Sequence, residues 1–214
     1  MASLAAEGIS NPIVVRRDGQ VEPAGARIVD VTGPGNMVHC LMSAREELLR
    51  TSCDVLVCYS DIVIEQVLMH EIVRSDVRHE RCEVVIDTEW ERYYRYRFNG
   101  GIGDAESLTL SGRRILDIGR TLSESAELPD GQFVGLVRFA ASTFRFLVGL
   151  WAEMNDPNLY TTDVLRELSR RGVPIDAIPV AGGWLEIDTI SDYEMAKSLL
   201  SGADRVPFFR RRLV

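Results

Sequence analysis

The sequence predicts an α/β protein in which helices flank a mixed, mostly parallel sheet. Three observations point to this class. Short β-rich runs alternate with helical patterns along the whole chain. The 214 residues, 46% hydrophobic and 26% charged, are enough for one well-buried core and not clearly for two. The run 54–59 is almost continuously apolar, which is typical of a central parallel strand covered on both faces. We therefore expect a single domain over residues 1–214.

The N-terminal half alternates strands and helices. Glycine and proline in 32–36 break the chain before an apolar helical pattern, and Ser60-Asp61 ends the apolar run. The segment 90–97 is rich in aromatic residues and arginine, and no local structure is assigned to it. The predicted elements are strands at 12–15, 27–31, 54–59 and 83–86, and helices at 37–50 and 64–73.

The C-terminal half begins with a hairpin, because Ser111-Gly112 separates two β-rich runs at 106–110 and 113–118. The final helix opens at Ser191, with Thr189 or Ser191 placed to cap it. Between them we predict strands at 132–139, 175–180 and 184–187, and helices at 143–154 and 162–171.

Composition excludes several classes of partner. The net charge of −8 and the pI near 5.0 argue against a nucleic-acid backbone or an anionic membrane as the main partner. The basic tail 210–212 is expected to be solvated. Neither a signal-peptide pattern nor a membrane-length apolar run is found, and the four cysteines form no disulfide pattern. We expect a cytoplasmic protein without a membrane span.

Asp61 is the first candidate site residue. It follows directly on the apolar run 54–59, and α/β sheets bind ligands beyond the carboxyl ends of their strands. A carboxylate there is suited to Mg²⁺, which takes one or two carboxylates together with phosphate and water. An aspartate that caps the next helix explains the same position equally well.

A second candidate lies in the segment 182–189. Two glycines allow a close backbone approach, and the strand that follows directs Glu186 and Asp188 to one face and Leu185 and Ile187 to the other. Two acids on one face are explained by a shared cation. A solvated strand face followed by a helix cap is the alternative.

Two further features could bind substrate. Trp90 and Arg97 belong to a mixture of rings and guanidinium groups that could enclose an ammonium group and pair with its phosphate. The alternative is that the aromatic rings of this segment cover a sheet edge while its arginines point outward into solvent. Asn36 follows a glycine-rich turn and could contact a bound substrate, or could simply cap the following helix.

Seven stretches, taken in order, carry a resemblance to a known family. They are residues 8–16, 36–44 and 54–61, then Val85-Ile86-Asp87 with Trp90 and Arg97, then 131–139, 162–165 and 183–193. Together they span about nine tenths of the chain. On them the chain resembles the phosphocholine and phosphonate cytidylyltransferases, whose nucleotidyltransferase domain is sometimes fused to phosphoenolpyruvate mutase.

The resemblance implies a nucleotide-diphospho-sugar transferase-like (GT-A-like) three-layer sandwich. It also implies that CMP is transferred from CTP to a small phosphonate or phosphocholine-like acceptor, with Mg²⁺ as cofactor and pyrophosphate as the second product. Carried over to this sequence, the catalytic and metal-binding pair is Asp61 and Asp188. Glu186 orients the site, and Asn36, Trp90 and Arg97 contact substrate.

The sequence departs from the family at its start. Family members open with a strand, a Gly-rich loop containing a basic residue, and a Pro-Lys pair, and this sequence shows none of them. The sequence thus resembles an N-terminally truncated member, and its activity is in question because those elements grip the triphosphate. Without the first strand, a strand edge stays unpaired, which predicts a homodimer or a partner. The alternative function is a catalytically impaired subunit that acts through such a partner.

Overall fold

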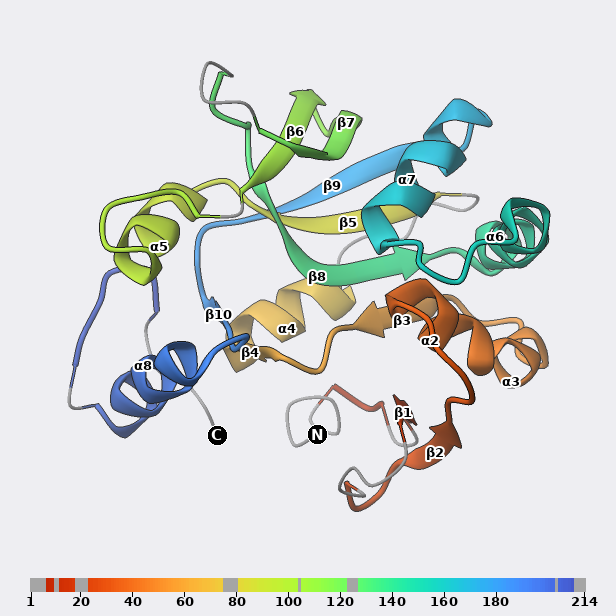
Figure 1. Ribbon diagram of the computed structural model, residues 1–214, viewed down its shortest axis with the longest axis horizontal. Coiled ribbons are helices and arrows are strands. Elements are labelled where there is room, and N and C mark those ends of the chain that lie inside the picture. Colours follow the sequence, from red (N-terminus) through yellow and green to blue (C-terminus); the bar gives the residue numbers. More distant parts are fainter. Residues whose placement is uncertain are drawn as a thin grey trace. The chain divides into compact units, whose positions relative to one another are not determined.

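The computed structural model describes residues 7–9, 12–17, 23–74, 81–103, 105–122, 127–202 and 204–209. The basic tail 210–212 lies outside the described residues. In the described part, helices and strands alternate along the chain (Figure 1), which confirms the predicted mixed α/β class.

The main sheet has six strands in the order β3-β8-β5-β9-β7-β6. The pairs β6–β7 and β7–β9 are antiparallel. Hydrogen bonds from Cys82 N to Pro174 O and from Thr88 N to Val180 O show that β5 and β9 run in the same direction. The strands are β3 (Val55–Cys58), β5 (Cys82–Asp87), β6 (Glu106–Ser111), β7 (Arg114–Thr121), β8 (Gln132–Phe139) and β9 (Ile175–Val180).

β3 lies at the end of this sheet, where the sequence predicted a central strand. Among the described strands its neighbour is β8 alone. Val55 is buried, Leu56 and Val57 are half-buried, and Cys58 is exposed. An apolar run shows that a segment packs against something, but it does not show how many strands lie beside it.

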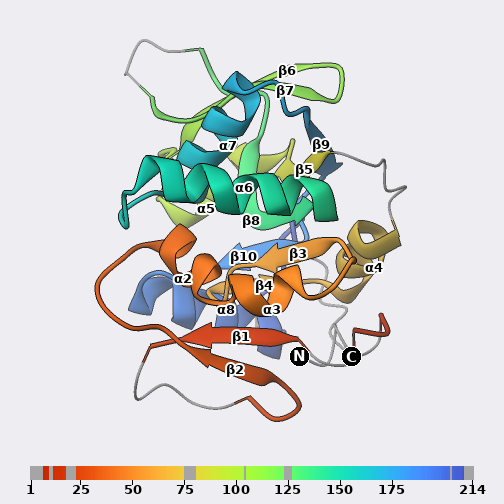
Figure 2. The same cartoon turned by 90° about the vertical axis from the view of Figure 1, so that its right-hand side faces the viewer.

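Two small sheets accompany the main one. β1 (Ile13–Arg16) pairs in parallel with β2 (Arg27–Asp30), side by side in Figure 2. β4 (Ile62–Ile64) pairs antiparallel with β10 (Trp184–Glu186), and Ile62 lies opposite Glu186. β4 was not predicted, because a three-residue strand offers too little alternation to detect.

The helices follow the predicted pattern with one break. The helix expected over 37–50 is two, α2 (Met37–Ser43) and α3 (Arg45–Leu49), which separate at Ala44. There the Arg45 guanidinium donates to the Met42 carbonyl at 2.8 Å, so a side chain uses a carbonyl that a continuous helix would bond through its backbone. The others are α4 (Gln66–Arg74), α5 (Trp90–Arg97), α6 (Ala141–Met154), α7 (Thr161–Arg170) and α8 (Ile190–Ser201).

The chain forms two compact units. One comprises Met1–Val57, Val77–Cys82 and Arg138–Ile175, and the other Cys58–Asp76, Glu83–Val137 and Asp176–Val214. Met42, Phe144 and Leu165 are fully buried in the first, and Ile86, Leu136 and Trp184 in the second. Of the helices described, none is long and apolar enough to cross a membrane.

Candidate functional site

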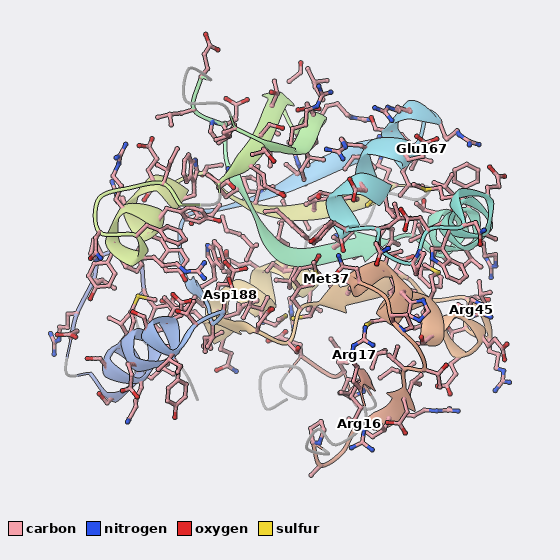
Figure 3. The ribbon with its side chains drawn as sticks, viewed as in Figure 1. Arg16, Arg17, Met37, Arg45, Glu167 and Asp188 are labelled. Atoms are coloured by element: carbon pink, nitrogen blue, oxygen red, sulfur yellow. The ribbon has the colours of Figure 1, made fainter. Side chains whose placement is uncertain are left out.

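The short β4–β10 pair brings Asp61 and Asp188 together within the second unit. Asp61 comes immediately before β4, and Asp188 follows two residues after the end of β10. Because the strands are antiparallel, these two positions fall at the same end of the pair. The backbone N–H of Ile187 donates to the Asp61 carbonyl at 2.8 Å, which fixes this juxtaposition. Figure 3 labels Asp188 between β10 and α8.

The carboxyl group of Asp61 responds electrostatically to Asp188. Loss of hydration is the largest cause that raises the pKa of Asp61, and the negative charge of Asp188 raises it further. A hydrogen bond within Asp61 itself and the positive charge of Arg97 oppose the rise. The two acids, 127 positions apart in the chain, therefore share one electrostatic environment.

Arg97, at the end of α5, lies among three carboxylates. Its Nη1 donates to Glu186 at 2.5 Å, its Nη2 to Asp188 at 2.7 Å, and its Nε to Asp192 Oδ1 at 2.9 Å. Nη2 also donates to Asp192 Oδ2 at 2.9 Å. Only 3% of the Arg97 side chain is exposed. Burial opposes the charged form, but the hydrogen bonds to Asp192 and Asp188 outweigh it and raise the pKa of Arg97, so the group remains a cation.

Glu186 and Asp188 reach the same guanidinium, and Leu185 beside them is fully buried. This is the alternation that the sequence analysis predicted for the segment. The side chain of Glu186 is 25% exposed and that of Asp188 is 43% exposed. Asp188 is therefore the more open of the two acids to a ligand from solvent.

Asp192 belongs to the same network and was not among the predicted site residues. Its Oδ2 accepts from the backbone N–H of Thr189 at 2.9 Å and of Asp188 at 3.2 Å, and Thr189 caps α8 in return. Burial alone would raise the pKa of Asp192, but hydrogen bonds from Arg97 and Thr189, together with the charge of Arg97, lower it to about 2. A capping pattern was the available sequence signal, and it does not reveal a partner 95 positions away.

The structure places the other two predicted residues as follows. Trp90 is 2% exposed. Its ring packs edge to face against Tyr94, and its Nε1 donates to the Pro129 carbonyl at 3.2 Å. Asn36 belongs to the first unit, at the N-cap position of α2. Its side chain donates to the Asn158 carbonyl at 3.3 Å and makes no capping hydrogen bond.

The donor set at Asp61 and Asp188 fits a hard divalent cation. Carboxylate oxygens are the ligands that Mg²⁺ prefers. Loss of hydration is the largest cause of the raised pKa of Asp61, and a cation would relieve the further contribution from the negative charge of Asp188. No group of three or more His, Cys, Asp or Glu side chains suited to a metal occurs among the described residues. A Mg²⁺ ion held by two carboxylates takes its other ligands from phosphate and water.

No protein-family model matches the chain. One curated relative is the CTP:phosphoglutamine cytidylyltransferase of Campylobacter jejuni (strain NCTC 11168). It is 26% identical over an alignment of 172 residues, and the match covers 75% of this chain and 66% of the relative. The chain therefore spans just under two thirds of that relative's length.

Two solved structures share the fold. The inositol-1-phosphate CTP transferase from T. maritima superimposes with a TM-score of 0.70 at 13% identity, over 94% of this chain and 81% of the other. A putative glucose-1-phosphate thymidylyltransferase from Bacillus anthracis gives a TM-score of 0.64 at 14% identity, over 98% of this chain and 82% of the other. The fold of this chain is thus the GT-A-like fold of nucleotidyltransferases.

Proposed function

We propose that the chain is a nucleotidyltransferase that transfers CMP from CTP to a small acceptor bearing a phosphate or phosphonate group. The observation that carries the proposal is the meeting of Asp61 and Asp188 at one end of the β4–β10 pair, within a nucleotidyltransferase fold. The relative and the first structure above are both named for CTP, which favours cytidine as the base.

The acceptor class follows from the chemistry of the site and from the names of similar proteins. Phosphoglutamine and inositol 1-phosphate, the acceptors in those names, are both phosphorylated small molecules. The resemblance on sequence favours a phosphonate or a phosphocholine-like compound within this class. An acceptor oxygen of this kind is already anionic, so the reaction needs no general base.

In the proposed reaction, an acceptor oxygen forms a bond to the α-phosphorus of CTP, and the bond from that phosphorus to the oxygen bridging to the β-phosphorus breaks. Pyrophosphate leaves with the electron pair of the broken bond. Asp61 and Asp188 would hold Mg²⁺, which when bound neutralises the charge of the phosphate oxygens. Arg97 pairs with both Asp188 and Glu186, and catalysis consists mainly of positioning and charge neutralisation.

The test is calorimetric titration of the protein with CTP and with UTP, each with and without Mg²⁺. We expect CTP to bind in a Mg²⁺-dependent way and Asp61→Asn to weaken that binding at least about tenfold. Glu194→Gln is the matched control, because it removes one negative charge from an exposed ion pair with Lys197 on α8.

Pyrophosphate release with CTP and either phosphocholine or aminoethylphosphonate then tests the transfer itself. Release that requires the acceptor and falls in Asp61→Asn supports the enzyme. Absence of both nucleotide binding and pyrophosphate release would reject the proposal and leave a non-catalytic subunit as the remaining explanation.

A further inference from the structure

The guanidinium of Arg97 is fully engaged inside the protein. Four hydrogen bonds connect it to Glu186, Asp188 and Asp192, and 97% of its side chain is enclosed. In this arrangement it has at most one of its five N–H groups left for a ligand. Arg97 therefore influences the reaction through a carboxylate that it holds, and not by binding substrate itself.

Asp188 is the carboxylate through which Arg97 would act. Arg97 bonds to Oδ2 of Asp188, whereas Oδ1 has no hydrogen-bond partner in the part of the chain that the structure describes. One oxygen is thus fixed from the protein side, and 43% of the side chain faces solvent. A carboxylate held by one oxygen has its rotation restricted while the other oxygen stays available to a cation.

Asp192 and Tyr93 hold Arg97 and the backbone near Asp188 in turn. Both carboxylate oxygens of Asp192 accept hydrogen bonds from Arg97, and Oδ2 also accepts from the backbone N–H of Asp188. Tyr93 lies four residues before Arg97 on the same face of α5, and its hydroxyl accepts from the backbone N–H of Glu186 at 2.8 Å. The helix is therefore attached to both the backbone and the side chains of the segment that carries Asp188.

We propose that Arg97, supported by Asp192, is a positioning residue that holds the Asp188 carboxylate in the orientation needed to bind a divalent cation. This inference rests on the proposed function. Repulsion between Arg97 and a cation acts in the opposite direction. However, the Arg97 guanidinium pairs with the carboxylates of Glu186, Asp188 and Asp192, and its charge also acts on the carboxylate of Asp61. The region therefore holds four negative charges and one positive charge, so the site still attracts a cation.

The test compares Arg97→Lys with Arg95→Lys in binding Mn²⁺, followed by electron paramagnetic resonance in the presence of CTP. Lysine keeps the charge but loses the planar fork that reaches three carboxylates at once. We expect Arg97→Lys to weaken Mn²⁺ binding about 10- to 100-fold. Arg95 lies on the same helix in an exposed pair with Glu91, so its substitution should leave Mn²⁺ binding unchanged.

A double-substitution cycle separates positioning from a general structural effect. If Arg97 acts through Asp188, Arg97→Lys adds no further loss of Mn²⁺ affinity in an Asp188→Asn background. Melting curves confirm that each variant is folded. If Arg97→Lys does not fold, Asp192→Asn, which removes the support of Arg97, takes its place with the same expectation.

The Mn²⁺ measurements distinguish a failure of the positioning role of Arg97 from a failure of the proposed nucleotidyltransferase function. Equal or tighter Mn²⁺ binding by folded Arg97→Lys, with normal binding by the unsubstituted protein, overturns the positioning role alone. The positioning role is also overturned if Arg97→Lys lowers the Mn²⁺ affinity of Asp188→Asn by the same factor as it lowers that of the unsubstituted protein. If the unsubstituted protein and Arg95→Lys bind no Mn²⁺ with CTP, the proposed function fails and the positioning role fails with it.

Discussion

Near Asp61 and Asp188, individual side chains each make several hydrogen bonds, and Asp87 is an example. Asp87 at the end of β5 is completely enclosed, and its carboxylate accepts from the backbone N–H groups of Glu89 and Gly182 and from Trp184 Nε1 at 2.8–3.0 Å. It thereby joins the end of β5 to the segment that leads into β10. Asp87 belongs to one of the matching stretches, but its hydrogen-bond partners could not be inferred from sequence, because Gly182 and Trp184 lie more than 90 positions away.

Asp87→Asn should destabilise the protein by about 2–3 kcal/mol, because the amide nitrogen of asparagine cannot accept the hydrogen bonds that one of the carboxylate oxygens accepts. Urea unfolding measures the change. Asp30→Asn, at an exposed ion pair with Arg16, serves as the control and should cost about 1 kcal/mol or less. Equal effects of the two substitutions would contradict the structural role of Asp87.

The lowered pKa of Asp192 predicts how stability depends on pH. Its folded pKa is about 2 and its ordinary value is 3.8, so the charged form stabilises the fold above pH 4 and this contribution is lost as the pH falls toward 2. Asp192→Asn should melt at a lower temperature than the unsubstituted protein at pH 7, and the gap should narrow between pH 4 and pH 2. A gap that stays constant over this range would show that the charge of Asp192 is not what stabilises the fold.

The residue types of the site could be inferred from sequence, but their contacts could not. Strand alternation placed Glu186 and Asp188 on one face, and the position after an apolar strand singled out Asp61. The roles of Trp90 and Arg97 stayed open, because rings and guanidinium groups suit both a substrate wall and internal packing. Packing decides which applies, and in the structure the Trp90 ring is enclosed and Arg97 faces acids.

At the scale of helices and strands, long periodic segments were predictable and short ones were not. β8, α6 and α7 agree with their predicted ranges within two residues at each end. α5 had no assignment, because its aromatic residues are only moderate helix formers and Glu89 provides no side-chain cap. Its helical form is supported by tertiary contacts such as that between Tyr93 and Trp184, whose rings lie 5.0 Å apart.

The turn into β10 depends on a glycine. Gly182 has φ of +70°, and a Cβ atom there would lie 2.5 Å from the Phe208 carbonyl oxygen. Gly182→Ala should therefore cost more than about 2 kcal/mol, measured by urea unfolding. Gly149→Ala on α6 is the matched control: its Cβ meets no atom within 4 Å, and helix propensity predicts a gain of about 0.5–1 kcal/mol. A small loss at Gly182 would mean that the turn can rearrange.

For the molecule as a whole, β3 bears on association with other chains, because among the described strands it has a neighbour on one side only. Its sequence, Val-Leu-Val-Cys, carries no charge that would discourage pairing with another chain. We expect concentration-dependent self-association, which light scattering measures, and Cys58→Lys should reduce it by placing a charge on the exposed end of the strand. Leu116→Lys is the control, because Leu116 is 59% exposed on β7. A protein that is monomeric at all concentrations, or equally affected by both lysines, would contradict this expectation.

The pairing of β4 with β10 also limits which insertions and deletions the sequence can tolerate. In a strand, neighbouring side chains point to opposite faces, so inserting or deleting one residue in 183–186 would shift the partner of Ile62 and turn one acid away from the other. Most of the fold would survive such a change while the site would not. In evolving variants, length changes should therefore be absent from this segment even where substitutions are common.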